Sequence, residues 1–134
     1  MSATTVVYEG ALRCSAKHEE SGVVVVTDAP KDNQGNGASF SPSELLSVSL
    51  GSCILSIMGI VARSNDIDMT GATAKVEKEM ANAPRRIAGI SVHVHVPGEL
   101  NEEQRNKLKA AAHACPVHNV LNVEAPITFS WGRG

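Results

Sequence analysis

The sequence predicts an α+β fold in which one long buried helix packs against antiparallel sheets. Residues 45–62 carry no charged side chain and are long enough for several helical turns. Shorter segments before and after this stretch alternate between apolar and polar residues, which is the period of half-buried strands. With 134 residues, of which 43% are apolar, the chain is expected to form a single domain over residues 1–134.

Composition and charge exclude some classes of partner. The formal net charge is -2, and aromatic residues make up 3% of the chain, so neither a basic surface nor a base-stacking platform for nucleic acid is expected. The first residues lack the basic start and apolar run of a signal peptide, which favours a cytoplasmic location. In that reducing compartment the three cysteines are expected to be catalytic, metal-binding or inert.

The N-terminal segment is predicted to form a meander of three short strands. Apolar and β-branched residues favour strands at 4–8, 12–18 and 23–28. Turns are expected at Glu9-Gly10 and at residues 19–22, where polar residues and glycine gather. The polar, glycine-bearing segment 32–37 is expected to form a surface loop.

The long helix has a well-marked start. Ser41 is a capping residue, Pro42 suits the first helical position, and Glu44 lies where a capping box needs an acid. The apolar residues that follow are spread around the whole circumference, so this helix is predicted to be buried on all sides.

Two environments could bury such a helix. Its length approaches that of a membrane span, but the flanks show no basic bias and no Trp or Tyr belt, so no membrane partner is predicted. Small residues instead form a stripe along one face, at Ser49, Ser52, Ser56 and Gly59. A chain of this size with few aromatics is expected to cover the helix by forming an intertwined homodimer.

The second half of the chain is predicted to form a hairpin, two helical segments and a last strand. Alternation predicts strands at 70–80 and 90–96, joined by a turn at residues 82–84. Asn101 is expected to cap a helix that ends before Pro116. Pro116 suits the start of a short helical turn through Leu121, and residues 127–131 are expected to form the closing strand.

Cys53, inside the long helix, and Cys115, directly before a proline, are the best candidates for chemistry. In a cysteine-based peroxidase one thiol is oxidised and a second resolves it as a disulfide. The residues alone leave the order open, because Cys115 could lie at a helix N-terminus, where a thiol pKa is lowered. The alternative to a catalytic Cys53 is a cysteine that is buried as a small apolar residue. Cys14 is interpreted as structural.

Two motifs carry a family resemblance. The segment Ser41-Pro42-Ser43-Glu44-Leu45-Leu46, leading to Gly51-Ser52-Cys53, and the later segment Cys115-Pro116-Val117-His118-Asn119-Val120-Leu121 resemble the OsmC/Ohr family of osmotically inducible and organic hydroperoxide resistance proteins. The resemblance implies a swapped homodimer with a long central helix and an active site at the subunit interface. It also implies an antioxidant thiol peroxidase without a cofactor, acting on organic hydroperoxides in the response to oxidative stress.

The same resemblance assigns roles to individual residues. Cys53 matches the peroxidatic cysteine and Cys115 the resolving cysteine, which together form a redox-active disulfide. An external dithiol, such as a lipoyl-bearing protein, would reduce that disulfide. Arg13 approximately matches the arginine beside the thiolate, although Arg63 or Arg86 could serve instead. A cation is needed because Cys53 lies roughly 18 Å beyond the helix start, too far for the helix dipole to act.

One position departs from the family pattern. The family's peroxidases carry a glutamate directly after the proline, where this chain has Ser43, and Glu44 follows one step later. One residue turns a helical side chain by about 100°, so Glu44 is a candidate catalytic residue whose position also suits a helix cap. This departure suggests a second hypothesis for the function, in which the chain forms an OsmC-like dimer with weak or changed redox activity.

Two further expectations concern ligands. Leu50, Ile54 and Ile57 are expected to form an apolar wall that favours hydrophobic peroxides. A metal- or ligand-binding module is the alternative from another class, with donors at His93, His95, His113, Cys115 and His118. No paired Cys-x-x-Cys motif supports that module, so no metal is predicted.

Overall fold

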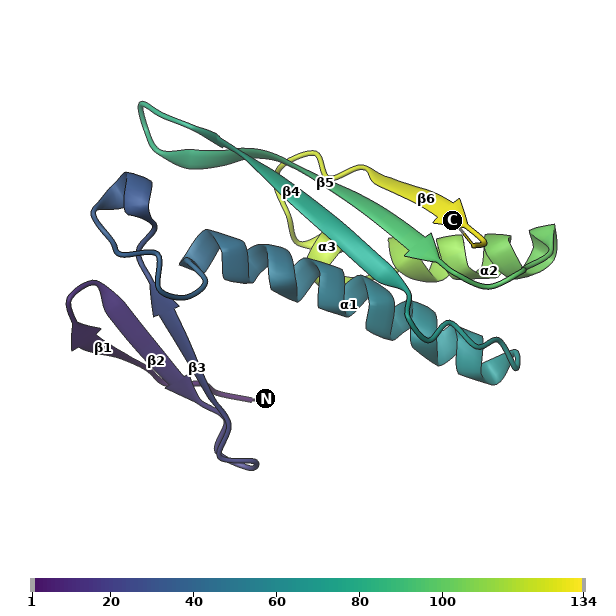
Figure 1. The fold of residues 1–134 in the computed structure, drawn as a ribbon, viewed down its shortest axis with the longest axis horizontal. Coiled ribbons are helices and arrows are strands. Elements are labelled where there is room, and N and C mark those ends of the chain that lie inside the picture. The colour runs from purple at the N-terminus through teal and green to yellow at the C-terminus, as the bar shows by residue number, and fades with distance from the viewer. Residues whose placement is uncertain (1, 134) are drawn as a thin grey trace. The chain divides into compact units, whose positions relative to one another are not determined.

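The computed structural model describes residues 2–133 and forms two compact units, Met1–Leu46 and Ser47–Gly134 (Figure 1). The first unit holds one three-stranded sheet and the start of the long helix. The second holds the rest of that helix, another three-stranded sheet and two further helices. The predicted α+β class is confirmed, while the single domain over residues 1–134 stays a prediction.

The N-terminal sheet is an antiparallel meander. Its strands are β1 (Val6–Gly10), β2 (Arg13–Lys17) and β3 (Val24–Asp28), in the order β1-β2-β3, and a short 3-10 turn, η1 (Lys31–Asn33), follows. The three predicted strands are confirmed with shifted ends. The first turn lies at Ala11 and Leu12, which have φ of 55° and 64°, instead of at Glu9-Gly10, because Gly10 still pairs with Arg13 across a bulge.

The long helix α1 (Pro42–Ser64) begins as predicted. The backbone N–H of Glu44 donates to Ser41 Oγ at 3.2 Å, and the N–H of Ser41 donates to Glu44 Oε1 at 3.0 Å. These two bonds form a reciprocal capping box. Ser41 is 2% exposed, so the cap is shielded from water.

In the single chain α1 is buried along one face only, so its predicted burial on all sides, which counted on a second subunit, stays a prediction. The buried residues share one face of the helix; they are Leu50, Gly51, Ile54, Met58 and Ala62. Val48 and Ile60 are 42% and 63% exposed. By length and composition, with a mean hydropathy of 2.2, α1 could cross a membrane, but the core helix of a soluble protein meets the same criterion. One chain of this size covers one face of α1 and leaves the other uncovered.

The second sheet combines a long hairpin with a strand from the end of the chain. Strands β4 (Thr73–Ala81) and β5 (Arg86–Val96) pair antiparallel, whereas β6 (Ile127–Trp131) pairs parallel to β5. Helices α2 (Glu102–His113) and α3 (Pro116–Asn119) connect β5 to β6. The short helical turn therefore ends at Asn119, two residues before its predicted end.

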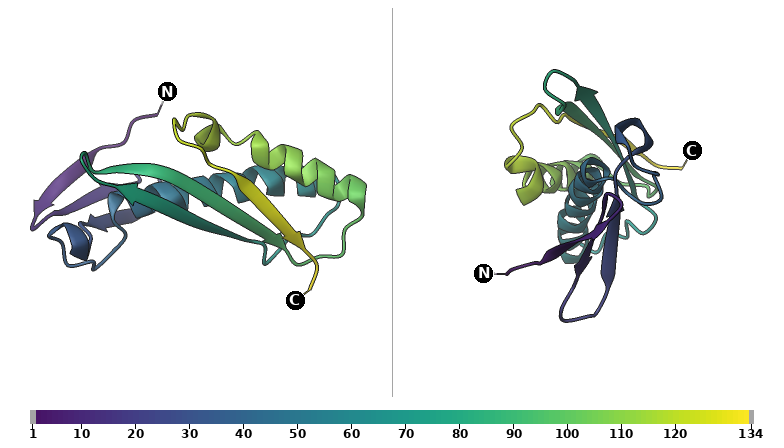
Figure 2. Two further views of the ribbon diagram at one scale, coloured as in Figure 1. Left: turned by 90° about the horizontal axis from the view of Figure 1, so that it is seen from above. Right: turned by 90° about the vertical axis from the view of Figure 1, so that its left-hand side faces the viewer.

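The core of the second unit lies between this sheet and the helices. Val92, Val94 and Val96 of β5 are almost fully buried. Both α1 and α2 lie on that face of the sheet (Figure 2). Helix α1 packs close to β4 at Gly51, where an added Cβ would lie 3.2 Å from Val76 Cγ2. Helix α2 covers β6 through Arg105, whose guanidinium lies 5.6 Å from the Trp131 ring centroid.

Candidate active site

Helix α1 carries Cys53 between two buried residues of its core face. Leu50 and Ile54 are fully buried, whereas Cys53 is partly exposed. The expected apolar wall for a peroxide is therefore wrong for these two side chains, because they pack in the core of the second unit and cannot also line a substrate site. Ile57 is partly exposed.

The second sulfur is placed by the turn that opens α3. Cys115 is the N-cap residue, with φ of -64° and ψ of 122°, and Pro116 takes the first helical position. Its side chain is fully buried, and its Sγ accepts a hydrogen bond from the backbone N–H of His118 at 3.4 Å. The predicted position before a helical turn is confirmed.

The structure brings Cys53 and Cys115 together. The Cys53 side chain is close enough to Cys115 to influence the titration of its thiol, and both thiols are free. Burial raises the pKa of Cys115, and the contact with Cys53 raises it further, while the backbone N–H groups of His118 and Val117 oppose this effect. Burial outweighs the N-terminal donors, so the Cys115 thiol is poorly suited to be the first attacking nucleophile.

Arg13 belongs to the first unit, on strand β2. Its Nε lies 3.8 Å from Oδ2 of Asp28, the residue opposite it in the β2–β3 register. Asp28 is 1% exposed and also accepts the backbone N–H of Ala38 at 2.9 Å. Asp28 was not among the predicted site residues, although a carboxylate at the end of a valine-rich strand is a signal that could have identified it.

The two other arginines considered for Cys53 are placed elsewhere in the second unit. Arg86 donates through Nη1 to the carbonyl oxygens of Asn82 and Pro84 at 3.0 and 2.9 Å, in the β4–β5 turn. Arg63 lies ten residues after Cys53 on the same helix, roughly 15 Å along its axis. Neither position favours contact with the Cys53 sulfur.

Glu44 is engaged at the helix start. Glu44 makes two hydrogen bonds with Ser41. The Ser41 hydroxyl also lies 3.3 Å from the hydroxyl of Ser43. The capping role is thus observed, and a catalytic role for Glu44 stays a prediction. Cys14 is a partly exposed β2 residue opposite Thr27, consistent with its structural interpretation.

The histidines do not assemble as the metal-binding alternative requires. His93 bonds to Thr128 Oγ1 at 2.7 Å and to Ser130 Oγ at 2.9 Å, and His95 Nδ1 lies 2.7 Å from the same Ser130 oxygen. Within residues 2–133, no three or more His, Cys, Asp or Glu side chains group where they could hold a metal ion. These hydroxyl contacts account for both strand histidines.

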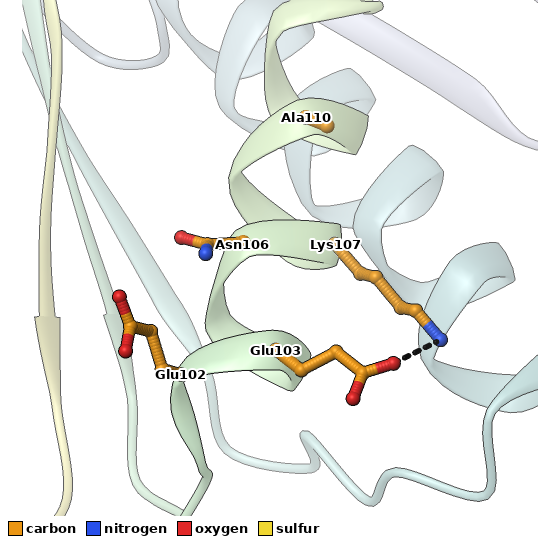
Figure 3. Close-up of a pocket in the computed structure, with 5 residues that line it drawn as sticks. All are labelled: Glu102, Glu103, Asn106, Lys107 and Ala110. Atoms are coloured by element: carbon orange, nitrogen blue, oxygen red, sulfur yellow. Dashed lines mark ion pairs between the residues drawn. The ribbon is translucent and has the colours of Figure 1, made fainter.

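The hollows on the second unit include two of similar volume. One, of about 510 Å³, borders the loop before β6; its lining residues are His113, His118, Asn119, Leu121, Val123, Glu124, Ala125, Pro126 and Ile127. The other, of about 530 Å³, lies on α2, where an ion pair joins Glu103 to Lys107 at 3.6 Å (Figure 3). Neither Cys53 nor Cys115 lines either hollow.

Residues 35–130 match the family model described as OsmC-like protein. A curated relative, an uncharacterized protein of Acinetobacter baylyi, is 29% identical over 103 residues, which cover 75% of this chain and 71% of the relative. Both cysteines lie inside the matched segment 35–130, whereas Arg13 precedes it.

Solved structures share the fold. A protein of Psychrobacter arcticus 273-4, described as an osmotic stress induced and detoxification response protein, is 39% identical, with a TM-score of 0.90 and coverage of 97% of this chain and 96% of that one. The organic hydroperoxide resistance protein OsmC of Legionella pneumophila is 21% identical, with a TM-score of 0.71 and 98% of each chain covered. An organic hydroperoxide resistance protein of Elizabethkingia anophelis is 20% identical, with a TM-score of 0.70 and coverage of 100% and 98%. The last two likenesses show the fold alone.

Proposed function

The chain belongs to the OsmC-like protein family, and on that premise we propose that it is a thiol-dependent peroxidase that reduces organic hydroperoxides. The observation that carries this proposal is the contact between Cys53 and Cys115, two free thiols far apart in the sequence. A thiol pair that can close to a disulfide is what a two-cysteine peroxidase needs.

In the proposed cycle, the Cys53 thiolate attacks the distal oxygen of ROOH. The O–O bond breaks, the sulfur becomes a sulfenic acid, and the leaving alkoxide takes a proton to give the alcohol ROH. The Cys115 thiol then attacks the Cys53 sulfenic acid, so that a disulfide forms and one water leaves. An external dithiol, such as a lipoyl-bearing protein, returns both sulfurs to thiols and is itself oxidised.

The surroundings of the two sulfurs support an order in which they react. Cys115 is fully buried and holds its proton, because burial raises its pKa. Cys53 is the more exposed of the two and so the more accessible to a peroxide. These differences support Cys53 as the peroxidatic cysteine and Cys115 as the resolving cysteine.

We assign Arg13 as the cation that stabilises the Cys53 thiolate. Asp28, beside it in the same sheet, is the acidic partner that orients its guanidinium. This pairing supports the assignment in a chain where Ser43 replaces the glutamate expected after the proline. Glu44 is the nearest acid in sequence to that position, and its catalytic role belongs to the same proposal.

A homodimer of single-domain, cytoplasmic subunits completes the proposal. Apolar side chains of the first sheet are widely exposed in the chain, including Val6, Val7, Tyr8, Val24 and Val26. Together with Val48 and Ile60 of α1, they form more exposed apolar surface than a monomer of this size usually leaves in water. A second copy of the chain is the occupant that fits, since a closed dimer buries the same surface on both subunits.

Consumption of an organic hydroperoxide tests the enzymatic proposal. With tert-butyl hydroperoxide and dihydrolipoamide, Cys53→Ser should abolish turnover, whereas Cys115→Ser should allow one equivalent to react and then stop. Cys14→Ser is the matched control and should behave as the wild type. Equal turnover by the wild type and Cys53→Ser would overturn the proposal and favour a family scaffold with changed chemistry.

A count of free thiols tests the cycle independently. One equivalent of hydroperoxide should remove two thiols per chain, without crosslinked species of higher mass if the disulfide forms within one subunit. Peptide mapping should then recover Cys53 joined to Cys115. Loss of a single thiol, or a disulfide that includes Cys14, would contradict the assignment.

A further inference from the structure

His118 connects the Cys115 turn to the loop before β6. Its backbone N–H donates to Cys115 Sγ at 3.4 Å, and its ring Nε2 lies 2.7 Å from the carbonyl oxygen of Ala125. A carbonyl oxygen only accepts, so Nε2 carries the proton and donates. One residue thus holds the sulfur by its main chain and the loop by its side chain.

The loop that receives the His118 ring is itself fixed to the central strand of the sheet. The carbonyl oxygen of Glu124 accepts from the N–H of Ile90 at 3.2 Å, and that of Pro126 accepts from the N–H of Val92 at 2.9 Å. Ala125 lies between these two anchors. The bond from His118 therefore fixes the Cys115 turn relative to strand β5, whose Ile90 and Val92 are buried.

The other ring nitrogen takes no part in this connection. Nδ1 of His118 is buried and has no hydrogen-bond partner among the described residues. An aromatic neighbour is His113 of α2, whose ring centroid lies 6.3 Å away in a T-shaped arrangement. Because Nδ1 makes no hydrogen bond, the polar anchoring of the ring rests on the single bond from Nε2 to Ala125.

We propose that His118 is a positioning residue that holds Cys115 where it can form a disulfide with Cys53. The inference deepens the proposed function and rests on it for the peroxide-dependent step. A disulfide requires a sulfur separation of about 2.05 Å and a dihedral angle near 90°, so a small displacement of the Cys115 turn slows its formation. The N–H bond to Sγ also favours the anionic sulfur that attacks the Cys53 sulfenic acid.

The test compares side chains at position 118 that differ in their donor. His118→Gln retains an N–H donor at similar reach, whereas His118→Leu has similar bulk and none. His113→Ala removes the neighbouring ring and is the matched control. Circular dichroism and thermal melting establish that each variant is folded, so the Gln and Leu variants can be compared even if one is less stable.

Formation of the Cys53–Cys115 disulfide by diamide is the first readout, because it requires no peroxidase activity. His118→Leu should slow this step about tenfold, the factor expected when one hydrogen bond that orders the turn is lost. His118→Gln and His113→Ala should stay within about threefold of the wild type. Equal rates for the wild type and His118→Leu, or equally slow Gln and Leu variants, would overturn the inference.

The second readout separates the two steps of the peroxide reaction. In a Cys115→Ser background, oxidation of Cys53 by one equivalent of tert-butyl hydroperoxide should be equally fast with and without the His118→Leu substitution, since His118 does not act on that step. With Cys115 intact, His118→Leu should accumulate sulfenic acid that dimedone traps. If Cys115→Ser gives no sulfenic acid with hydroperoxide but the diamide rates of the intact chain still depend on position 118, the proposed function fails while the positioning role stands.

Discussion

Asp28 and Arg13 form a pair in which one partner is buried and the other reaches solvent. The Asp28 side chain is 1% exposed, the Arg13 side chain is 42% exposed, and Arg13 Nε lies 3.8 Å from Asp28 Oδ2. The carboxylate also accepts the N–H of Ala38, which belongs to the segment that leads to α1. One buried acid therefore organises both a candidate catalytic arginine and the approach to the helix that carries Cys53.

Asp28→Asn should weaken this arrangement without changing the shape of the side chain. The amide oxygen can still accept from Ala38, but the negative charge beside Arg13 is lost. We expect a loss of up to about 1 kcal/mol in the free energy of unfolding, measured with urea, since an ion pair with a partly exposed arginine contributes about that much. The Cys53 thiolate should also react more slowly with hydroperoxide. Arg13→Gln is the control, and unchanged kinetics in both variants would remove Arg13 from the proposed site.

The raised pKa of Cys115 predicts how stability depends on pH. The folded chain retains the Cys115 proton to higher pH than the unfolded chain, so in the alkaline range the native state binds more protons. The contribution to stability is fully present below the ordinary thiol pKa of about 8.5 and is lost as pH rises through the folded value. Urea unfolding of the reduced protein across this range measures it.

Cys115→Ala supplies the control for that measurement. The difference in unfolding free energy between the wild type and Cys115→Ala should change as pH increases from about 8 to 10, since the variant lacks the titrating thiol. A difference that is constant with pH would contradict the raised pKa. Resolution of the Cys53 sulfenic acid should also accelerate in this range, because the thiolate form of Cys115 is the nucleophile.

Gly51 and Gly59 offer a matched pair within α1. An added Cβ at Gly51 would lie 3.2 Å from Val76 Cγ2, whereas at Gly59 nothing lies within 4 Å. Gly51→Val should destabilise the chain by about 1–3 kcal/mol through overpacking against β4. Gly59→Ala should raise helix stability by up to about 1 kcal/mol. Thermal unfolding measures both, and equal effects would show that α1 does not approach β4 at Gly51.

The uncovered face of α1 predicts the response to a charge at Ile60. This residue is 63% exposed in the single chain, so Ile60→Glu should not disturb the core. If a second copy covers this face, a buried carboxylate without a partner should convert the dimer to monomer in light-scattering measurements. Lys75→Glu, on the polar side of β4, is the control. A wild type that is monomeric by light scattering would contradict the proposed dimer.

The capping box predicts a measurable contribution at the start of α1. Ser41→Ala removes the hydroxyl that accepts from Glu44 and should cost about 1 kcal/mol of unfolding free energy. Glu44→Gln should cost less, since an amide oxygen can still accept from the Ser41 N–H. Equal losses in these two variants, measured by urea unfolding, would mean that the charge of Glu44 acts beyond the cap.

Local patterns predicted most of the fold because strands, caps and turns depend on neighbouring residues. The alternation of β5 and the cap at Asn101 are both observed. Sequence reasoning missed the parallel pairing of β6 with β5, since that register joins segments separated by two helices. It also misjudged Leu50 and Ile54, because an apolar helix pattern does not tell which apolar side chains face a core and which face a ligand.

Residue types and their order alone determined the α+β class, the capped helix and the two cysteines worth attention. Only the tertiary structure decided that Cys53 influences the Cys115 thiol, that Asp28 lies beside Arg13, and that one face of α1 is uncovered. The physical reason is the separation along the chain between the residues that interact. Capping and alternation arise from bonds between close neighbours, whereas contact between distant sulfurs and the burial of a thiol depend on how whole elements pack.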